Sequence, residues 1–303
     1  MRVEYADQAA LVVKVLPFVE KEDAFALKGG TAINLFQLNL PRLSVDIDLT
    51  YTKITPRDEA VREINDSLDR IASDLKAHGI NCRISGTPVS RKLLCSDGAA
   101  SIKVEPNFIL RGTTCPTRKL PLCDRAQDMF GFAQINVLSF PELYGGKICA
   151  ALDRQHPRDL FDIAQFYKEH SLSEVKDGFI ALALGHNRPL HELLNPIMQD
   201  QREIFAQQFA GMSDTPFTYD EHVATFERLR SEVLDLFTDE DKSHMLNFVS
   251  LEDHPSAFGI PHLAELPAIV WKRRNLESLR ASNPGKFAEQ RTKLAEVFSI
   301  CTG

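Results

Sequence analysis

The feature that most constrains this chain is a pair of glycines, Gly29 and Gly30, followed within twenty residues by two aspartates. The glycines stand between an apolar segment and a short stretch with helical spacing, which predicts a strand–turn–helix unit. Residues 45–51 alternate and are β-branched, so they predict a second strand that carries Asp46 and Asp48. Because residues i and i+2 of a strand point to the same side, the two carboxylates share one face, with α-carbons roughly 7 Å apart.

This arrangement favours phosphate chemistry. Two neighbouring carboxylates repel each other unless a cation lies between them, and Mg²⁺ is the hard ion that combines a few carboxylates with phosphate and water. Glycines let the backbone approach a ligand closely, and the free amides at the start of a helix favour phosphate. The stretch therefore predicts a site for magnesium-assisted phosphoryl or nucleotidyl transfer.

A later strand adds two charged residues. Residues 100–110 predict a strand on which Lys103 and Glu105 share a face. If this strand neighbours residues 45–51, Glu105 can supply a third carboxylate to the metals and Lys103 can meet a phosphate. The alternative is an amphipathic strand with a surface lysine and glutamate.

A third group of charged residues lies on predicted helices. Lys147 follows Gly145 and Gly146, and two glycines inside a helix indicate a kink or a close approach. Asp159 and Asp162 are three residues apart on the next predicted helix. The functional interpretation is a lysine for nucleotide phosphates and an aspartate that positions a substrate; the structural one is a set of helical salt bridges.

Composition narrows the classes of protein. The net charge of −7 disfavours a protein that coats nucleic acid non-specifically, although a local basic patch remains compatible. The six cysteines form no C-x-x-C pair, the N-terminus is not a signal peptide, and no apolar stretch is long enough to span a membrane. We expect a cytoplasmic protein, favour a monomer, and expect no membrane partner.

The chain divides by the character of its segments. Residues 1–138 mix helices and strands, with a long loop predicted at 111–128, whereas residues 139–303 are helical almost throughout, including one long helix at 189–209. The prediction is an α+β protein: an N-terminal α/β lobe with a mixed sheet, followed by a C-terminal helical bundle.

Together these motifs resemble the AbiEii/AbiGii toxin family, part of the polymerase β-like nucleotidyltransferase superfamily. The resemblance spans about residues 20–170, and its most specific element joins Gly-Gly-Thr to the R-x-S-x-D-x-D strand. It is carried by Lys28-Gly29-Gly30-Thr31, Arg42-Leu-Ser44-Val-Asp46-Ile-Asp48, Lys103-Val-Glu105, Lys147 and Arg158-Asp159-Leu-Phe-Asp162.

The resemblance implies a nucleotidyltransferase fold, a helical second lobe and an active site in the cleft between them. Members are the toxin half of bacterial or abortive-infection toxin–antitoxin pairs. They bind NTPs with Mg²⁺, and some add nucleotides to the 3′ end of tRNA, which stops translation. A tRNA acceptor and a separate antitoxin protein are therefore expected partners.

The resemblance also implies roles for individual residues. Gly30 and Thr31, with Lys28, Gly29 and Lys103 beside them, would hold the nucleotide, and Asp46 and Asp48 would bind two Mg²⁺ ions. Glu105 would complete the metal site or deprotonate the attacking hydroxyl; it stands where the superfamily often has an aspartate. Lys147 would neutralise phosphate, Asp159 or Asp162 would position the acceptor or a metal, and Arg42 and Ser44 would brace the strand or touch phosphate.

Two other functions stay open at this point. One is nucleotidyl transfer to a small molecule or a protein, and the other is a non-catalytic nucleotide-binding module, against which the intact Asp46, Asp48 and Glu105 argue. A tRNA acceptor needs a basic surface instead. The candidates for that surface, which are otherwise solvated charges, are Arg111, Arg118, Lys119, Arg125 and the run Trp271-Lys272-Arg273-Arg274.

Overall fold

The computed structural model describes residues 3–299, so Cys301 lies outside it, and it forms two compact units. The first unit runs to Ser139 and also contains Phe209–Pro216; the second contains Phe140–Gln208 and the chain from Phe217 onwards. The sequence pattern places residues 209–216 in the second domain. In the structure they belong to the first, where the Leu43 amide donates to the Met212 carbonyl over 2.8 Å.

The first unit is built on a mixed sheet, as predicted. Its strands, in the order β3-β4-β5-β2-β1-β7-β6, pair antiparallel except for the parallel pairs β2–β5 and β1–β7. The strands described are β1 Phe25–Lys28, β2 Asp46–Tyr51, β3 Asn81–Ser85, β4 Lys92–Ser96, β5 Ser101–Asn107, β6 Arg118–Pro121 and β7 Gln134–Val137.

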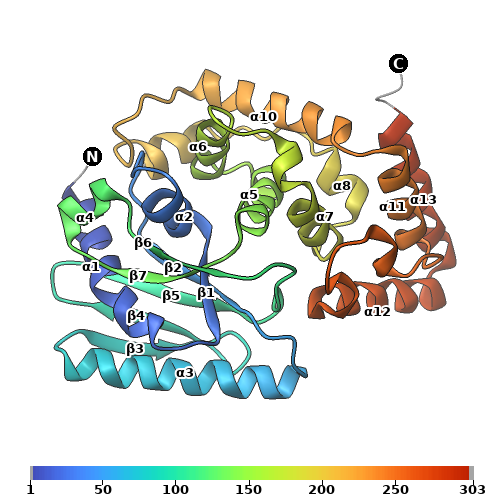
Figure 1. Cartoon of the computed structure of the whole chain (residues 1–303). Coiled ribbons are helices and arrows are strands. Elements are labelled where there is room, and N and C mark those ends of the chain that lie inside the picture. The colour runs from blue at the N-terminus through green and yellow to red at the C-terminus, as the bar shows by residue number, and fades with distance from the viewer. Residues whose placement is uncertain (1–2, 300–303) are drawn as a thin grey trace. The chain divides into compact units, whose positions relative to one another are not determined.

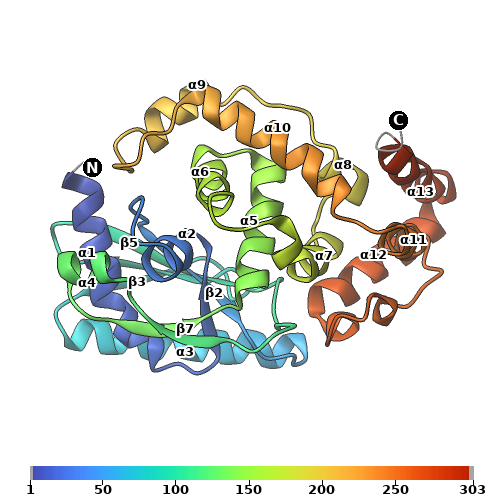
Figure 2. The same cartoon turned by 45° about the horizontal axis from the view of Figure 1, so that its top comes forward.

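Helices cover both faces of this sheet. Helix α1 (Val3–Glu20) packs on β5 and β7, and α3 (Arg57–Ala77) packs on β3 and β4, each through an apolar stripe that is fully buried. Helix α2 (Gly29–Ala32) continues into a π-helical turn, Ile33–Gln37, and contacts β1 and β2. Figures 1 and 2 show α2 and α3 on opposite faces of the sheet.

The side chains of β2 alternate between the buried core and the face that carries the two aspartates. Ile47 and Leu49 are fully buried, whereas Asp46 and Asp48 are half-exposed. Since successive side chains of a strand alternate between faces, the apolar core fixes the side on which both carboxylates lie.

Residues 111–128 are not the long loop that the sequence predicts. They contain β6, which pairs with β7, and the start of α4 (Asp124–Phe130). Strand β6 is an edge strand with mostly exposed side chains, so the alternation that would have revealed it is missing.

The second unit is helical, as predicted. Helices α5 and α7 pack so closely that a Cβ on Gly145 would lie 2.5 Å from the carbonyl carbon of Gly178. The helices described are α5 Phe140–Arg154, α6 Pro157–Phe166, α7 Lys176–Leu184, α8 Leu190–Leu194, α9 Arg202–Ile204, α10 Tyr219–Asp235, α11 Asp239–Val249, α12 Pro267–Ser282 and α13 Pro284–Ser299, with short 3₁₀ turns at Leu172–Val175, Pro255–Phe258 and Leu263–Glu265.

The predicted helix at 189–209 is broken. Helix α8 ends at Leu194, because Asn195 precedes Pro196 and the residue before a proline is driven out of the helical region. Only α9 and a π-helical turn at Phe205–Phe209 follow. Within residues 3–299, no helix combines the length and the apolar character that crossing a bilayer requires.

Candidate active site

The charged residues predicted on three strands lie in two neighbouring rows across the sheet. The register pairs Lys28 of β1 with Asp48 of β2, and Asp48 with Glu105 of β5. One row away, Asp46 is paired with Lys103. Because directly paired residues point to the same side of a sheet, all five side chains belong to one face.

The glycine turn closes onto this row. Gly29 has a φ of +72°, and a Cβ there would lie 2.7 Å from Asp48 Oδ2. A Cβ on Gly30 would lie 2.6 Å from Nη2 of Arg42 and 3.0 Å from Oγ of Ser44. Both positions therefore favour glycine, the first for its backbone conformation and its contact with a carboxylate, the second because a Cβ would displace the buried guanidinium of Arg42.

Thr31, Arg42 and Ser44 form a buried brace beneath the turn. The Thr31 hydroxyl lies 2.9 Å from Ser44 Oγ and donates to the Asp46 carbonyl, which ties α2 to the strand of the aspartates. The Arg42 side chain is 2% exposed and donates to the Leu43 carbonyl over 2.9 Å. Of the two roles that the sequence leaves open for Arg42 and Ser44, these contacts favour bracing.

Lys92, which the sequence motifs do not single out, completes the row. Its Nζ lies 2.8 Å from Glu105 Oε1, and Glu105, with a weaker contribution from Asp46, raises the pKa of Lys92. The hairpin register that pairs Ser96 with Ser101 extends to Lys92 opposite Glu105, so the Asp97–Gly98 turn is the sequence signal that could have found it.

A cavity of about 390 Å³ opens in the first unit beside this row. Its polar wall includes Lys28, Asp48, Lys92 and Glu105. The size falls within the range of about 300–1,000 Å³ that small-molecule sites occupy. Its other lining residues are Val89, Ser90, Arg91, Pro106, Asn107, Phe108 and Ile109.

The donor set fits a divalent cation in chemistry. Asp46 and Asp48 supply hard oxygen ligands on one face, next to the glycine turn. Within the described part of the chain, however, no three His, Cys, Asp or Glu side chains are grouped closely enough to hold a metal. Glu105, the predicted third ligand, forms its ion pair with Lys92 instead.

The second group of predicted residues forms a buried ion cluster in the second unit. Lys147 Nζ lies 2.9 Å from Asp159 Oδ1 and 2.9 Å from Asp162 Oδ2, and all three side chains are at most 5% exposed. Burial would raise the pKa of Asp159, but Lys147 and Arg154 outweigh it and hold that pKa well below its usual range.

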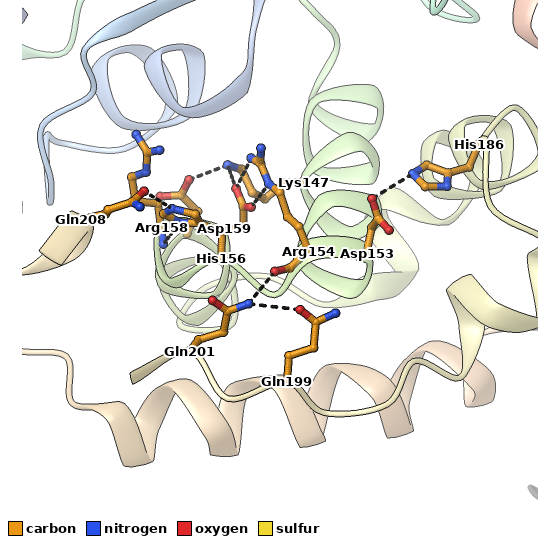
Figure 3. A network of polar contacts seen from close by, with 11 residues as sticks. Lys147, Asp153, Arg154, His156, Arg158, Asp159, His186, Gln199, Gln201 and Gln208 are labelled. Carbon is orange, nitrogen blue, oxygen red and sulfur yellow. Dashed lines mark hydrogen bonds and ion pairs between the residues drawn. The ribbon is translucent and has the colours of Figure 1, made fainter. Parts of the chain in front are cut away.

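Arg154 links this cluster to solvent. Its Nε and Nη2 donate to the two Asp159 carboxylate oxygens over 2.6 and 3.1 Å, while its side chain is 62% exposed (Figure 3). Such a two-point contact fixes the plane of the guanidinium. No sequence motif assigned a role to Arg154, although its position five residues before Asp159 could have indicated that the two side chains interact.

The close approach predicted at Gly145 is explained by packing. The neighbour of Gly145 is the backbone of α7, and the reciprocal Cβ on Gly178 would lie 2.1 Å from the Pro141 carbonyl oxygen. The glycine therefore brings α5 against α7 and is not evidence for a ligand at Lys147.

Of the four basic residues predicted near 111–125, one is buried, two form ion pairs, and Arg118 is exposed. Arg111 is 5% exposed, which contradicts its placement on an RNA-facing rim. Lys119 pairs with Glu20, and Arg125 pairs with Asp214.

The fold resembles that of a known protein. The structure is similar to that of MenT4, a nucleotidyltransferase toxin from Mycobacterium tuberculosis H37Rv, with a TM-score of 0.59 and 18% identity over 80% of this chain and 89% of that one. At this identity the likeness establishes the nucleotidyltransferase-toxin fold. No curated protein matches the sequence.

Residues 10–259 match the nucleotidyl transferase AbiEii toxin family of type IV toxin–antitoxin systems. The chain therefore belongs to this family and is a nucleotidyltransferase toxin. Membership in such a system implies an antitoxin partner.

Proposed function

We propose that this toxin transfers a nucleoside monophosphate from an NTP to an RNA acceptor, with the 3′ end of tRNA as the target, and so blocks translation. The observation that carries the proposal is the contact of the Gly29 turn with Asp48, in a row with Lys28 and Glu105 at the edge of the 390 Å³ cavity. Across that row, the carboxylates of Asp48 and Glu105 lie between Lys28 on one side and Lys92 on the other, a mixture of charges that suits a triphosphate with its counter-ion.

Asp46 and Asp48 would hold Mg²⁺, since they are the neighbouring hard oxygen donors of the site. When bound, Mg²⁺ would polarise the α-phosphate and offset the charge of the leaving pyrophosphate. Lys28 and Lys92 add positive charge along the same row. Gly29 keeps the space beside Asp48 open to the phosphates.

In the proposed step, the acceptor hydroxyl attacks the α-phosphorus, one new P–O bond forms, and the bond to pyrophosphate breaks. Glu105, held by Lys92, accepts the hydroxyl proton. Most of the catalytic effect comes from positioning and charge, as in other phosphoryl-transfer sites.

In the second unit, we propose that Asp159 is a positioning residue for Arg154, and that Lys147 and Asp162 hold Asp159 in place. The contacts that support this are the two Arg154–Asp159 hydrogen bonds and the two ion pairs of Lys147. A direct role of Lys147 in neutralising phosphate remains a prediction.

The test is incubation of the protein with total tRNA, Mg²⁺ and each α-labelled NTP in turn. We expect label from one NTP to enter tRNA, and the Asp46→Asn/Asp48→Asn variant to lose at least 100-fold of this activity. Asp58→Asn, which changes an exposed aspartate of α3 in the same unit, is the matched control and should keep full activity. Binding of the NTP without labelling of any RNA would instead direct the search to small-molecule or protein acceptors.

A further inference from the structure

A second cavity, of about 230 Å³, lies in the second unit where the loop after α7 meets α12 and α13. Helices α12 and α13 contact each other, and both contribute lining residues. Its size is below the roughly 300–1,000 Å³ of sites for whole small molecules. A single flat ring fits this space better than a nucleoside triphosphate does.

Trp271 forms one wall of this cavity. It is the only tryptophan of the chain, and 55% of it is exposed. An exposed tryptophan adds little to folding, whereas its flat ring is the surface on which unpaired bases stack in single-stranded nucleic-acid sites.

Lys272 lies beside Trp271 and is held by the backbone. Its Nζ donates to the carbonyls of His186 and Arg188 over 2.8 and 2.7 Å. These bonds account for two of the three donors of the ammonium group, and burial lowers the pKa of Lys272 to about 8. A fixed donor thus stands next to the exposed ring.

Side-chain amides supply the remaining polar wall. Asn187, Asn275 and Gln290 line the cavity, and among residues 3–299 their amide groups form no hydrogen bond with the protein. An amide offers a donor and an acceptor side by side, which is the pattern that the edge of a base requires.

The two helices that line the cavity, α12 and α13, carry a net charge opposite in sign to that of the whole chain. Residues 267–299 contain seven Lys and Arg against three Glu, although the chain as a whole carries −7. Arg274 and Lys286 are exposed, and within the described structure neither side chain forms an ion pair or hydrogen bond. Lysine and arginine side chains near a stacking ring can neutralise the phosphates of a bound strand.

We propose that this pocket binds one unpaired base of a single-stranded RNA segment, stacked on Trp271, with Arg274 and Lys286 on the flanking phosphates. The proposal deepens the RNA acceptor of the proposed function and rests on it for the choice of RNA. The sequence singles out the run 271–274 as a candidate RNA-binding surface. The proposal gives this run a specific ligand, a single base whose edge forms hydrogen bonds with side-chain amides, and not the surface of a duplex.

Because Trp271 is the only tryptophan, its fluorescence reports on this pocket alone. We would titrate the full-length protein with short single-stranded oligoribonucleotides at low salt, and follow both tryptophan emission and the polarisation of a labelled oligonucleotide. We expect saturable quenching, and we expect Trp271→Ala to weaken binding by roughly 5- to 150-fold. Phe132→Ala, which removes an aromatic residue that is 65% exposed elsewhere, is the matched control and should bind normally.

Charge and strandedness give two further readouts. Arg274→Ala/Lys286→Ala should reduce the slope of log affinity against log salt by about 0.7 for each phosphate that the protein no longer neutralises. Duplex RNA should quench far less than a single strand. Binding without quenching, an unchanged affinity of Trp271→Ala, equal quenching by duplex, or no binding at all would each overturn the proposal.

The same titration distinguishes the proposed base-binding pocket from the proposed nucleotidyl transfer. Asp46→Asn/Asp48→Asn should quench like the wild type, because neither residue lines this pocket. Quenching without any nucleotide transfer would uphold the pocket and contradict the proposed function. Transfer to RNA without quenching would do the reverse.

Discussion

At the scale of single residues, Gly29 carries the tightest requirement of the candidate site. Its positive φ and the 2.7 Å from a Cβ to Asp48 Oδ2 are two separate reasons to exclude a side chain. A matched comparison can separate them, because Gly79, at the end of α3, has a similar φ of +79° and a Cβ there would meet no atom within 4 Å.

Gly29→Ala and Gly79→Ala should both lose roughly 1–2 kcal/mol of unfolding free energy from backbone strain. Only Gly29→Ala should also lose nucleotide transfer, by tenfold or more, because only there is a carboxylate displaced. Chemical denaturation and the tRNA-labelling assay measure the two effects. Equal activities of the two variants would show that the turn does not position Asp48.

Lys147 is the residue on which the buried cluster depends. Lys147→Met would remove the lysine that pairs with both Asp159 and Asp162 and leave these buried carboxylates only partly compensated. We expect a loss of about 3–5 kcal/mol of unfolding free energy. Adding Asp162→Asn to the same variant should restore part of it, because one uncompensated charge is removed.

Lys176→Met is the comparison for Lys147→Met. Lys176 lies 2.7 Å from Asp241, but its side chain is 28% exposed, so we expect a loss of at most about 1 kcal/mol. Denaturant unfolding of the three variants measures the differences. Similar losses for Lys147→Met and Lys176→Met would mean that burial does not set the strength of the cluster.

At the scale of elements, the sequence predicts best where a buried face imposes a period. The strand of Asp46 and Asp48, the strand of Lys103 and Glu105, and the helix with Val61, Ile64 and Leu68 all have such a face. The two strands carry the carboxylates of the candidate site in the first unit, which is why these residues could be named in advance. Strand β6 and α4 were missed because few of their side chains are buried.

The sequence alone could not predict the register between strands or the close packing between helices. The pairing of Asp48 with Glu105, and the partnership of Glu105 with Lys92, depend on which strands are neighbours in the sheet. The two glycines before Lys147 were an ambiguous signal for the same reason. Only the position of α7 shows that Gly145 serves helix packing.

At the scale of the whole molecule, buried histidine couples stability to pH. His222 is 1% exposed, its ring stacks on Tyr219 with centroids 5.2 Å apart, and neither ring nitrogen has a hydrogen-bond partner in the described structure. Burial, with a smaller contribution from His156, lowers the pKa of His222 to about 4. In the unfolded chain the same group titrates near about 6.5.

The unfolded state therefore binds more protons between about pH 6.5 and 4, and stability falls as the pH falls through this window. His222→Phe should reduce that fall by an amount on the order of 1–3 kcal/mol, since one pKa unit corresponds to about 1.4 kcal/mol. Urea unfolding at pH 7 and pH 5 measures it. An identical pH dependence in the variant would show that His222 is not the coupled group.

The central claim is that Asp46, Asp48 and Glu105, on one face of the sheet, transfer a nucleotide. The most direct test follows the label from both ends of the NTP. We predict that an α-labelled NTP leaves its label on tRNA, that the γ-label of the same NTP leaves as pyrophosphate, and that Asp46→Asn/Asp48→Asn abolishes both. Transfer of the γ-label to the acceptor would mean phosphoryl rather than nucleotidyl transfer. Unchanged transfer by the double variant would place the chemistry elsewhere in the molecule, and either result would contradict the claim.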